Sequence, residues 1–225
     1  MQHEVERFRA RSRWLHWAIV LASAALLLTG AFLYVDQWGI AAQDGWSRLI
    51  HRIMGVVFVG VPLLYFLITP GRTLAWIKEV FSWGRDDIEW LKAAPEYYFG
   101  GDESRMPPQP HMNSGQKMWA LVAVVCGVGL AITGLIMWFF KGDVGPGVFQ
   151  WSVFFHDVFV IAGGTMTLVH VYLGAVHPRM TESLKSMFTG KVSAEYAKSH
   201  YGKWYREVAG HKEVAQESPG AQSEA

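Results

Sequence analysis

The chain has 225 residues, of which 51% are hydrophobic and only 17% charged, and its formal net charge is +1 at pH 7. The apolar residues gather into long runs, which excludes an ordinary water-soluble domain and indicates a membrane protein. We expect contact with membrane lipid and no nucleic-acid partner. The single cysteine, Cys126, excludes an internal disulfide, a cysteine-held iron–sulfur cluster and covalently attached haem.

Four apolar runs are long enough to cross a membrane as helices, because ~20 helical residues span the ~30 Å hydrocarbon core of a bilayer. These runs cover residues 14–35, 49–69, 118–140 and 148–176. Basic residues precede the first run as in a signal peptide, but its apolar length exceeds the roughly 7–15 residues of a signal core, so we interpret it as a retained anchor. We therefore predict an all-α fold, an integral membrane four-helix bundle.

The distribution of basic residues predicts the orientation of this bundle. Almost every Lys and Arg lies before the first run, between the second and the third, or after the fourth. The positive-inside rule therefore predicts a multi-pass protein of the cytoplasmic (inner) membrane with both termini in the cytoplasm. Tryptophans then form an inner belt and an outer belt, which consist of Trp14, Trp17, Trp76 and Trp119, and of Trp38, Trp46, Trp138 and Trp151.

The chain divides into a basic cytoplasmic lead at 1–13 and a membrane domain at 14–177, which includes a long cytoplasmic connection at 70–117. Residues 73–83 and 86–98 of this connection are amphipathic and predict helices in the headgroup plane, with a solvated loop as the alternative. Irregular chain is expected at its prolines, Pro95, Pro107, Pro108 and Pro110. A cytoplasmic segment at 178–208 and a disordered tail at 209–225 follow, and no internal repeat is evident.

The nine histidines differ in their surroundings. Four lie in polar tails or loops, and we expect them to be ordinary solvated side chains: His3, His111, His200 and His211. Four others lie inside or at the ends of the apolar runs: His16, His51, His156 and His170. An ionisable group is costly in a membrane and is by default a functional residue, so these four require a common explanation.

The predicted topology sorts these four residues into two levels. His51 and His156 fall near the outer face, and His16 and His170 fall near the inner face. Each level thus has two imidazoles from different helices. Such pairs are typical of b-type haems with both axial positions filled, which suits electron transfer and leaves no open site for oxygen.

The spacing within the fourth run supports this interpretation. His156 and His170 are 14 residues apart, which puts them ~21 Å apart along one helix and within ~40° of the same face. We predict all four histidines as haem-iron ligands. His177, which abuts Pro178 at the end of the run, is the one rival for the inner position.

Several short motifs accompany the histidines. They are His16-Trp17, His51 with Gly55, the run from Asn113 to Met118, Thr133-Gly134, and His170-Val171-Tyr172. With them the chain resembles, over about residues 8–208, the cytochrome b (gamma) subunit of membrane-bound respiratory formate dehydrogenase. The resemblance implies the same ligand pairs, His51 with His156 for an outer haem b and His16 with His170 for an inner one. It also implies an electron-transfer subunit whose complex oxidises its substrate in another chain.

The resemblance further implies partners and a second substrate. In that family the subunit takes electrons from a periplasmic iron–sulfur beta subunit, which serves a molybdenum- or tungsten-pterin catalytic alpha subunit, and reduces menaquinone beside the inner haem. The quinone, menaquinone or ubiquinone, would lie at Asn113, Gly115 and Gln116, whose amides can hydrogen-bond its oxygens. The alternative is that Asn113 or Ser114 only caps the third long helix, although the two roles can coexist. The sequence of the connection at 82–111 departs from the family and leaves the donor and the quinone type open. Whether the complex forms a higher oligomer is also left open by the sequence.

Two other classes of function fit part of these observations. A four-helix cytochrome b can serve a quinone-linked NiFe hydrogenase or act alone as a quinone oxidoreductase, and a copurifying dehydrogenase would separate these cases. A haem-free transporter or scaffold would instead use the histidines for protons or ions, and purified protein without b-type absorption bands would indicate it.

Overall fold

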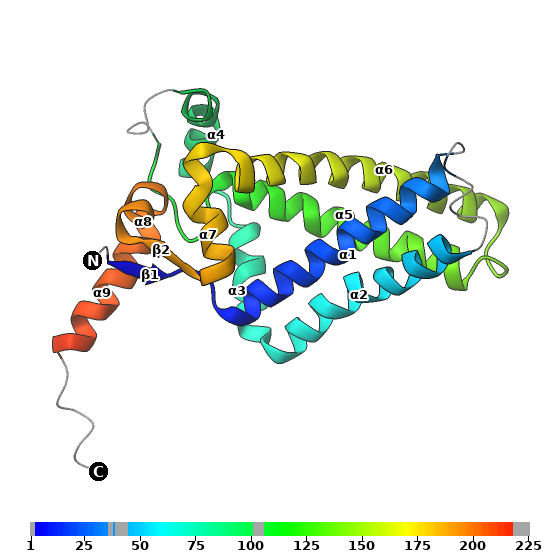
Figure 1. Cartoon of the computed structure of the whole chain (residues 1–225), viewed down its shortest axis with the longest axis horizontal. Coiled ribbons are helices and arrows are strands. Elements are labelled where there is room, and N and C mark those ends of the chain that lie inside the picture. The colour runs from blue at the N-terminus through cyan, green and yellow to red at the C-terminus, as the bar shows by residue number, and fades with distance from the viewer. Residues whose placement is uncertain (1–2, 36–37, 39–44, 101–105, 218–225) are drawn as a thin grey trace, which may run out of the picture.

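The computed structural model describes residues 3–35, 38, 45–100 and 106–217 of the chain, with side chains as far as residue 210. Four long helices lie alongside one another and make up a bundle (Figure 1). They are α1 (Ala10–Tyr34), α2 (Trp46–Ile68), α5 (Ser114–Phe139) and α6 (Pro146–Val171). Each is long and apolar enough to cross a membrane, which confirms the four predicted spans to within a few residues.

The outside of the bundle is apolar and its buried positions hold small side chains. Leu67 and Leu168 are each 73% exposed, as expected of side chains that face lipid. The buried residues of the long helices are Ala22, Thr29, Ser47, Ser114, Lys117, Ala120, Cys126, Thr133 and Ser152. With the exception of Lys117 these are small, and small residues let helix backbones approach closely within a membrane.

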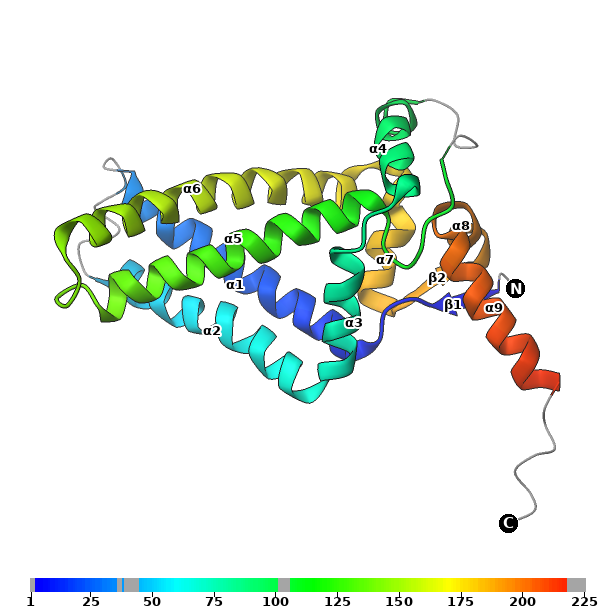
Figure 2. The same ribbon diagram turned by 180° about the vertical axis from the view of Figure 1, so that it is seen from behind.

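The bundle consists of two helical hairpins, because α1 packs against α2 and α5 packs against α6. α1 ends and α2 begins at the same end of the bundle where α5 ends and α6 begins, on the right in Figure 1 and on the left in Figure 2. The short elements gather at the opposite end. They include α3 (Pro70–Val80), α4 (Arg85–Tyr98), α7 (Thr181–Thr189), α8 (Ala194–His200) and α9 (Gly202–Glu217).

Helices α3 and α4 occupy the amphipathic stretches of the long connection, where helices are predicted. The prediction of irregular chain at Pro95 is wrong, because this residue lies inside α4. A proline inside a helix loses one hydrogen bond to the preceding turn. The helix nevertheless continues, and the Phe99 N–H donates to the Pro95 carbonyl oxygen at 3.0 Å. The other three prolines of the connection lie in nonhelical chain, as predicted.

A small antiparallel sheet joins the two ends of the chain, and the sequence interpretation does not include it. Strand β1 (Glu4–Glu6) pairs with β2 (Lys191–Ser193) and sets Val5 opposite Val192. Both valines are buried with aromatic residues of the C-terminal segment. The tail expected to be disordered from residue 209 is helical as far as Glu217, and residues 218–225 lie outside the described part of the chain.

Two of the histidines expected to be solvated are packed at this end instead. His111 lies among aromatic rings of both terminal segments, and burial, aided by the charge of Arg7, lowers its pKa to about 4. His200 stacks on a tyrosine ring and is only partly exposed. His3 is exposed as predicted, and the side chain of His211 lies outside the described part of the chain.

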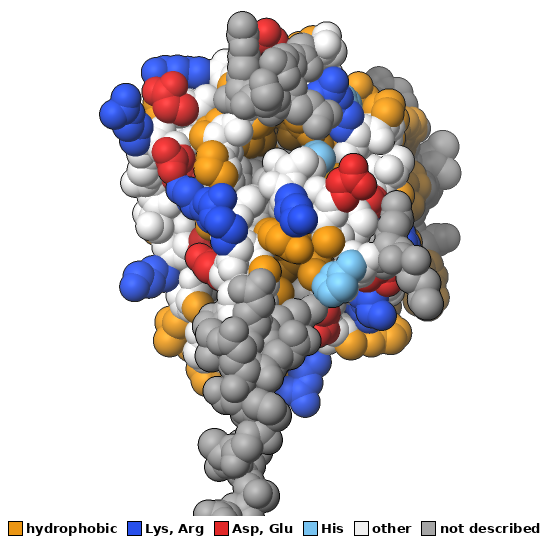
Figure 3. Space-filling view, turned by 90° about the vertical axis from the view of Figure 1, so that its left-hand side faces the viewer, with side chains coloured by type: hydrophobic (Ala, Val, Ile, Leu, Met, Phe, Trp, Pro, Cys, Tyr) orange, Lys and Arg blue, Asp and Glu red, His pale blue; other side chains and the backbone are white. Residues whose placement is uncertain are grey.

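The two ends of the molecule differ in character from its sides. Viewed from the end that carries the short helices, Lys, Arg, Asp and Glu side chains are scattered among apolar ones (Figure 3). Trp14 and Trp119 lie near this end, in the first turns of α1 and α5, whereas Trp46 and Trp138 lie near the other end. Polar ends with tryptophans nearby and apolar sides are what a bilayer requires.

Candidate functional site

The hairpin-connection end of the bundle carries one pair of histidines. His51 lies near the start of α2 and His156 in the first half of α6. Their ring centroids are 6.4 Å apart, with 55° between the ring planes. Two metal–nitrogen bonds of ~2 Å, with ~1.1 Å from each nitrogen to its ring centre, put two axial imidazoles ~6.2 Å apart. The pair therefore has the spacing of two axial ligands on one iron.

A threonine hydroxyl meets each of these rings. Thr29 Oγ1 of α1 is 2.9 Å from His51 Nδ1, and Thr133 Oγ1 of α5 is 2.8 Å from His156 Nδ1. With each Nδ1 engaged in a hydrogen bond, Nε2 is the nitrogen that remains for a metal. Histidines that bind metals commonly have their second ring nitrogen held in this way.

A second pair lies toward the opposite end of the bundle. His16 of α1 and His170 of α6 have ring centroids 6.4 Å apart and an interplanar angle of 59°, close to the values of the first pair. Trp119 of α5 stacks on the His170 ring at 4.8 Å and 13°. His16 Nδ1 is buried and has no hydrogen-bond partner among the described residues.

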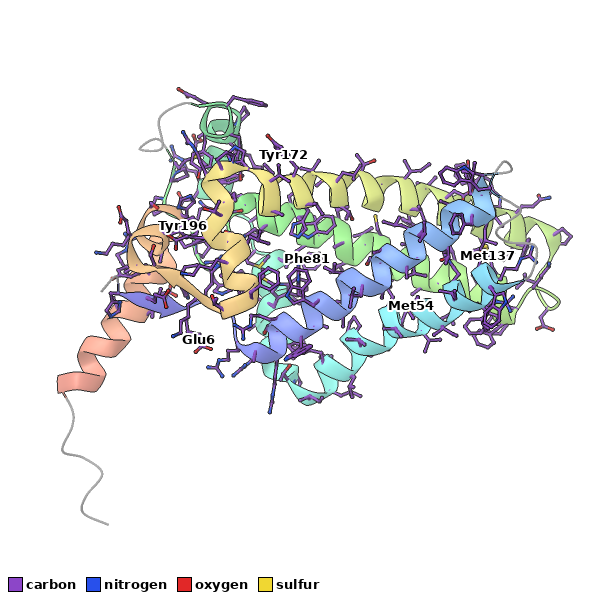
Figure 4. All side chains as sticks on the ribbon, in the orientation of Figure 1. Glu6, Met54, Phe81, Met137, Tyr172 and Tyr196 are labelled. Atoms are coloured by element: carbon purple, nitrogen blue, oxygen red, sulfur yellow. The ribbon has the colours of Figure 1, made fainter. Side chains whose placement is uncertain are left out.

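Helix α6 connects the two levels, because it carries one histidine of each pair. The 14 residues from His156 to His170 correspond to ~21 Å along the helix. In Figure 4, Met54 and Met137 lie toward the end with the hairpin connections, and Tyr172 lies toward the opposite end. The structure thus brings the four candidate ligands together in two pairs, and their role as ligands stays a prediction.

His177, the rival for the inner position, is engaged elsewhere. Its Nε2 is 3.2 Å from the Tyr98 carbonyl oxygen, and its Nδ1 accepts the backbone N–H of Arg179 at 3.3 Å. The residue is buried at the end of the π-helix Tyr172–Val176, which follows α6. Since both ring nitrogens have other partners, His170 is the better candidate for a metal.

The residues predicted to hold a quinone open helix α5, at the same end as the second histidine pair. Asn113 Oδ1 accepts the Gln116 N–H at 2.8 Å, and the Asn113 N–H donates to Gln116 Oε1 at 3.0 Å. This reciprocal pair is a capping box, so Asn113 caps α5, and its role toward a quinone stays a prediction. Gln116 Nε2 also donates to the Tyr201 hydroxyl at 3.1 Å.

Gly115 lies between these two residues and packs under Trp90 of α4. A Cβ atom at this position would come within 2.9 Å of the indole ring, so a larger residue would displace Trp90. Because the cap occupies the side-chain oxygens of Asn113 and Gln116, the amide N–H groups of these side chains remain as their available polar groups. These are hydrogen-bond donors, which a quinone carbonyl accepts.

The sequence of this chain is similar to those of known proteins. Residues 7–190 match the family described as prokaryotic cytochrome b561. The chain belongs to the prokaryotic cytochrome b561 family. It is 28% identical over 207 residues to the formate dehydrogenase, cytochrome b556 subunit, of Haemophilus influenzae, which covers 89% of this chain and 82% of that one.

Two Escherichia coli proteins are similar over comparable lengths. The nitrate-inducible formate dehydrogenase cytochrome b556(Fdn) subunit is 25% identical over 218 residues, 91% of each chain. The formate dehydrogenase cytochrome b556(fdo) subunit is 27% identical over 214 residues, 91% of this chain and 93% of that one. The predicted resemblance to formate dehydrogenase cytochromes is therefore confirmed, as is the predicted fold class of a helical membrane bundle. Membership of the cytochrome b561 family implies haem b, and both histidine pairs fit that group in spacing.

The sequence interpretation missed the role of the two threonines in this cytochrome. Thr29-Gly30 precedes His51, and Thr133-Gly134 precedes His156, and the threonine and histidine are separated by 22 and 23 positions in the sequence. The same three positions thus recur once in each helical hairpin. The recurrence of Thr-Gly at nearly the same sequence separation before a histidine is the signal that could have revealed these contacts.

A buried ion pair beside the candidate quinone residues was also missed. Lys117 Nζ is 2.9 Å from Asp87 Oδ1, and the Ser114 hydroxyl donates to the same oxygen at 2.8 Å. Burial acts to raise the pKa of the Asp87 carboxyl, but the hydrogen bonds from Lys117, Gly84 and Ser114 outweigh it and hold this pKa below its usual value. The pair ties α4 to the start of α5.

Proposed function

We propose that this chain is the dihaem cytochrome b subunit of a respiratory formate dehydrogenase in the cytoplasmic membrane, with both termini in the cytoplasm. His51 and His156 hold the outer haem b, and His16 and His170 hold the inner one. The observation that carries the proposal is the recurrence of one ring-centroid distance, 6.4 Å, at two levels of one bundle. The names of the similar proteins support formate dehydrogenase as the complex.

When bound, two b haems supply one-electron transfer between the two faces of the membrane. Each histidine pair would supply two imidazole ligands to one haem iron. The lipid-facing helices keep bulk water from the histidines. Moving an electron inward against the membrane potential costs ~2.3 kcal/mol per 100 mV for a full crossing, which the electron donor has to supply.

Asn113, Gly115 and Gln116 form the quinone site in this proposal, for menaquinone or ubiquinone. Their amide N–H groups hydrogen-bond the quinone oxygens, and the helix N-terminus favours the negative charge that develops on reduction. Reduction to quinol consumes two protons, and the charged surface at this end gives access to the water that delivers them.

The electron donor in this proposal is a periplasmic iron–sulfur beta subunit, which serves a molybdenum- or tungsten-pterin alpha subunit. Resemblance to the formate dehydrogenase cytochromes supports both partners. Mass spectrometry of the copurifying subunits, with the mass of the intact complex, identifies them and gives the oligomeric state. Copurification of a NiFe hydrogenase would instead assign the chain to that complex. Purification without any partner would indicate a stand-alone quinone oxidoreductase.

The inner haem is tested by electron delivery in the purified complex. We expect His170→Ala to lose one b haem and to abolish formate-dependent quinone reduction, while reduction of a soluble dye by the catalytic subunits persists. His177→Ala is the matched control, since His177 lies seven residues further on and has other partners. Normal haem content and quinone reduction in His170→Ala would contradict the proposal.

The quinone site needs a variant that separates binding from helix capping. Serine is as good an N-cap as asparagine but has no amide N–H. We therefore expect Asn113→Ser to raise the KM for quinone severalfold while the thermal stability and the haem content stay at wild-type values. Unchanged quinone kinetics in this variant would show that Asn113 is a cap alone.

A further inference from the structure

Two threonines of the bundle make the same set of contacts in separate hairpins. The Thr29 hydroxyl lies 2.7 Å from the Ala25 carbonyl oxygen, one turn earlier in α1, and 2.9 Å from His51 Nδ1. The Thr133 hydroxyl lies 2.7 Å from the Gly129 carbonyl oxygen in α5, and 2.8 Å from His156 Nδ1. Both threonines are buried, so no water competes for these contacts.

These contacts determine where the protons lie. A hydroxyl has one proton, and a carbonyl oxygen can only accept, so each threonine donates its proton to the backbone of the preceding turn. The lone pairs of Oγ1 are then left for the histidine, and Nδ1 has to donate. Each ring is thereby held as the tautomer with hydrogen on Nδ1 and a lone pair on Nε2, which is the form that binds a metal through Nε2.

The residues next to the threonines make room for the rings. At Gly30 a Cβ atom would lie 3.5 Å from His51 Cε1, and at Gly134 it would lie 3.6 Å from His156 Cε1. The Thr-Gly pair thus places a hydroxyl on one side of each imidazole and an open backbone beside it. The same device occurs once in each hairpin and serves both members of one pair.

One ring of the other histidine pair, that of His16, differs in this respect. His16 Nδ1 is buried and has no hydrogen-bond partner among the described residues. An acceptor at Nδ1 increases the electron density on Nε2 and stabilises the more highly charged, oxidised iron. A ring without such an acceptor stabilises the oxidised iron less.

We propose that Thr29 and Thr133 are positioning residues that lower the reduction potential of the haem held by His51 and His156, relative to that of the haem held by His16 and His170. This inference rests on the proposed function, in which both pairs hold haem. Its consequence is a direction: electrons that enter at the outer level move to the inner level with a favourable change in potential. The hydroxyls act through the ligands and contact no substrate.

Potentiometric titration of the purified complex tests this inference, with haem absorption as the readout. Thr29→Val and Thr133→Val remove the acceptor, and we expect each to shift the outer midpoint potential upward while the inner midpoint stays in place. Because the two threonines act through different ligands, we expect the double variant to shift it by about the sum. Thr29→Ser and Thr133→Ser keep a hydroxyl and are expected to restore the wild-type midpoint.

Two controls make the result specific. Thr167 of α6 makes the same contact with the preceding turn, at 2.8 Å from the Gly163 carbonyl oxygen, and hydrogen-bonds no histidine among the described residues. We therefore expect Thr167→Val to leave both midpoints unchanged. His156→Ala removes the outer wave and identifies the remaining wave as the inner one. If valine prevents assembly, Thr29→Cys and Thr133→Cys offer a weaker acceptor of similar size. We expect these variants also to shift the outer midpoint potential upward.

Failure of this inference differs from failure of the proposed function. An outer midpoint that is the same in wild type, in the valine variants and in the cysteine variants overturns the inference, although both haems are present. A wild-type complex with fewer than two haem waves overturns the proposed function itself.

Discussion

His111 is a buried titratable residue that joins distant parts of the chain. Its Nε2 is 3.4 Å from the Arg7 carbonyl oxygen, and the Arg7 guanidinium donates to the His111 carbonyl oxygen at 2.9 Å. That guanidinium also lies 3.4 Å from the centre of the Tyr201 ring. Burial, and then the charge of Arg7, lowers the pKa of His111 to about 4. The neutral ring is therefore part of the packing between the two terminal segments.

This pKa predicts a pH dependence of stability. The pKa of His111 in the folded protein is below the ordinary value of ~6.5. The neutral ring therefore contributes its full stabilisation of the fold above pH ~6.5, and this stabilisation falls as the pH drops toward about 4. The loss is on the order of 3 kcal/mol for the packing of the terminal segments. We expect thermal unfolding in detergent to shift to lower temperature from about pH 7.5 to about pH 5, and to shift less in His111→Gln. An equal shift in both proteins would contradict this assignment.

Helix α5 packs against α6 through a glycine that has no room for a side chain. At Gly129 a Cβ atom would lie 2.2 Å from the Phe159 ring, whereas at Gly127 it would be in ordinary contact with Phe58 at 3.7 Å. Phe159 follows His156 by one turn, so a displaced ring disturbs the same helix face.

We therefore expect Gly129→Ala to destabilise the bundle by ~1–3 kcal/mol through overpacking and to reduce outer-haem occupancy. Gly127→Ala, in the same helix, is the control and should behave like wild type in thermal unfolding and haem content. Equal behaviour of the two variants would show that the close approach of α5 and α6 has no energetic weight.

The Asp87–Lys117 pair holds α4 against the start of α5. Removal of one partner from a buried pair leaves an uncompensated charge and costs ~3–5 kcal/mol, whereas removal of both is often nearly neutral. We expect Lys117→Met to lower the unfolding temperature in detergent markedly and to increase hydrogen exchange in α4. The double variant Asp87→Asn with Lys117→Met should recover most of the loss. A single variant as stable as the double one would count against this role.

The long helices could be predicted from the sequence, because a membrane span is specified by the length of an apolar run and little else. Helix α5 begins at Ser114, behind the Asn113 cap, and α1 begins at Ala10, so the spans extend a few residues beyond their apolar runs. The continuation of α4 through Pro95 could not be predicted, because proline disfavours a helix locally. The burial of Trp90 and Tyr97, which belong to the same helix, overrides this preference.

At the scale of the whole molecule, the features that could be predicted are those that depend on helix direction and periodicity. Pairing of the four histidines follows from four antiparallel spans and a 14-residue interval on α6. Contacts between residues far apart in the chain escaped prediction: Thr29 with His51, Lys117 with Asp87, and the β1–β2 sheet. Each depends on which side chains face each other after folding, and a single sequence does not specify that.

The two hairpins with matching Thr-Gly and histidine positions suggest why two levels exist in so short a chain. The His51–His156 level receives one histidine from each hairpin, and α6 also carries His170, which pairs with His16 of α1. One continuous helix thus fixes the distance between the two levels, and the short helices close only the end near the inner pair.

The most direct test of this arrangement is the haem content per chain of the purified protein, measured by pyridine haemochrome absorption with electron paramagnetic resonance of the oxidised form. We predict two low-spin haems b per chain in wild type, and one in each of the variants His156→Ala and His170→Ala. A single haem in wild type, or two haems retained in either variant, would contradict it.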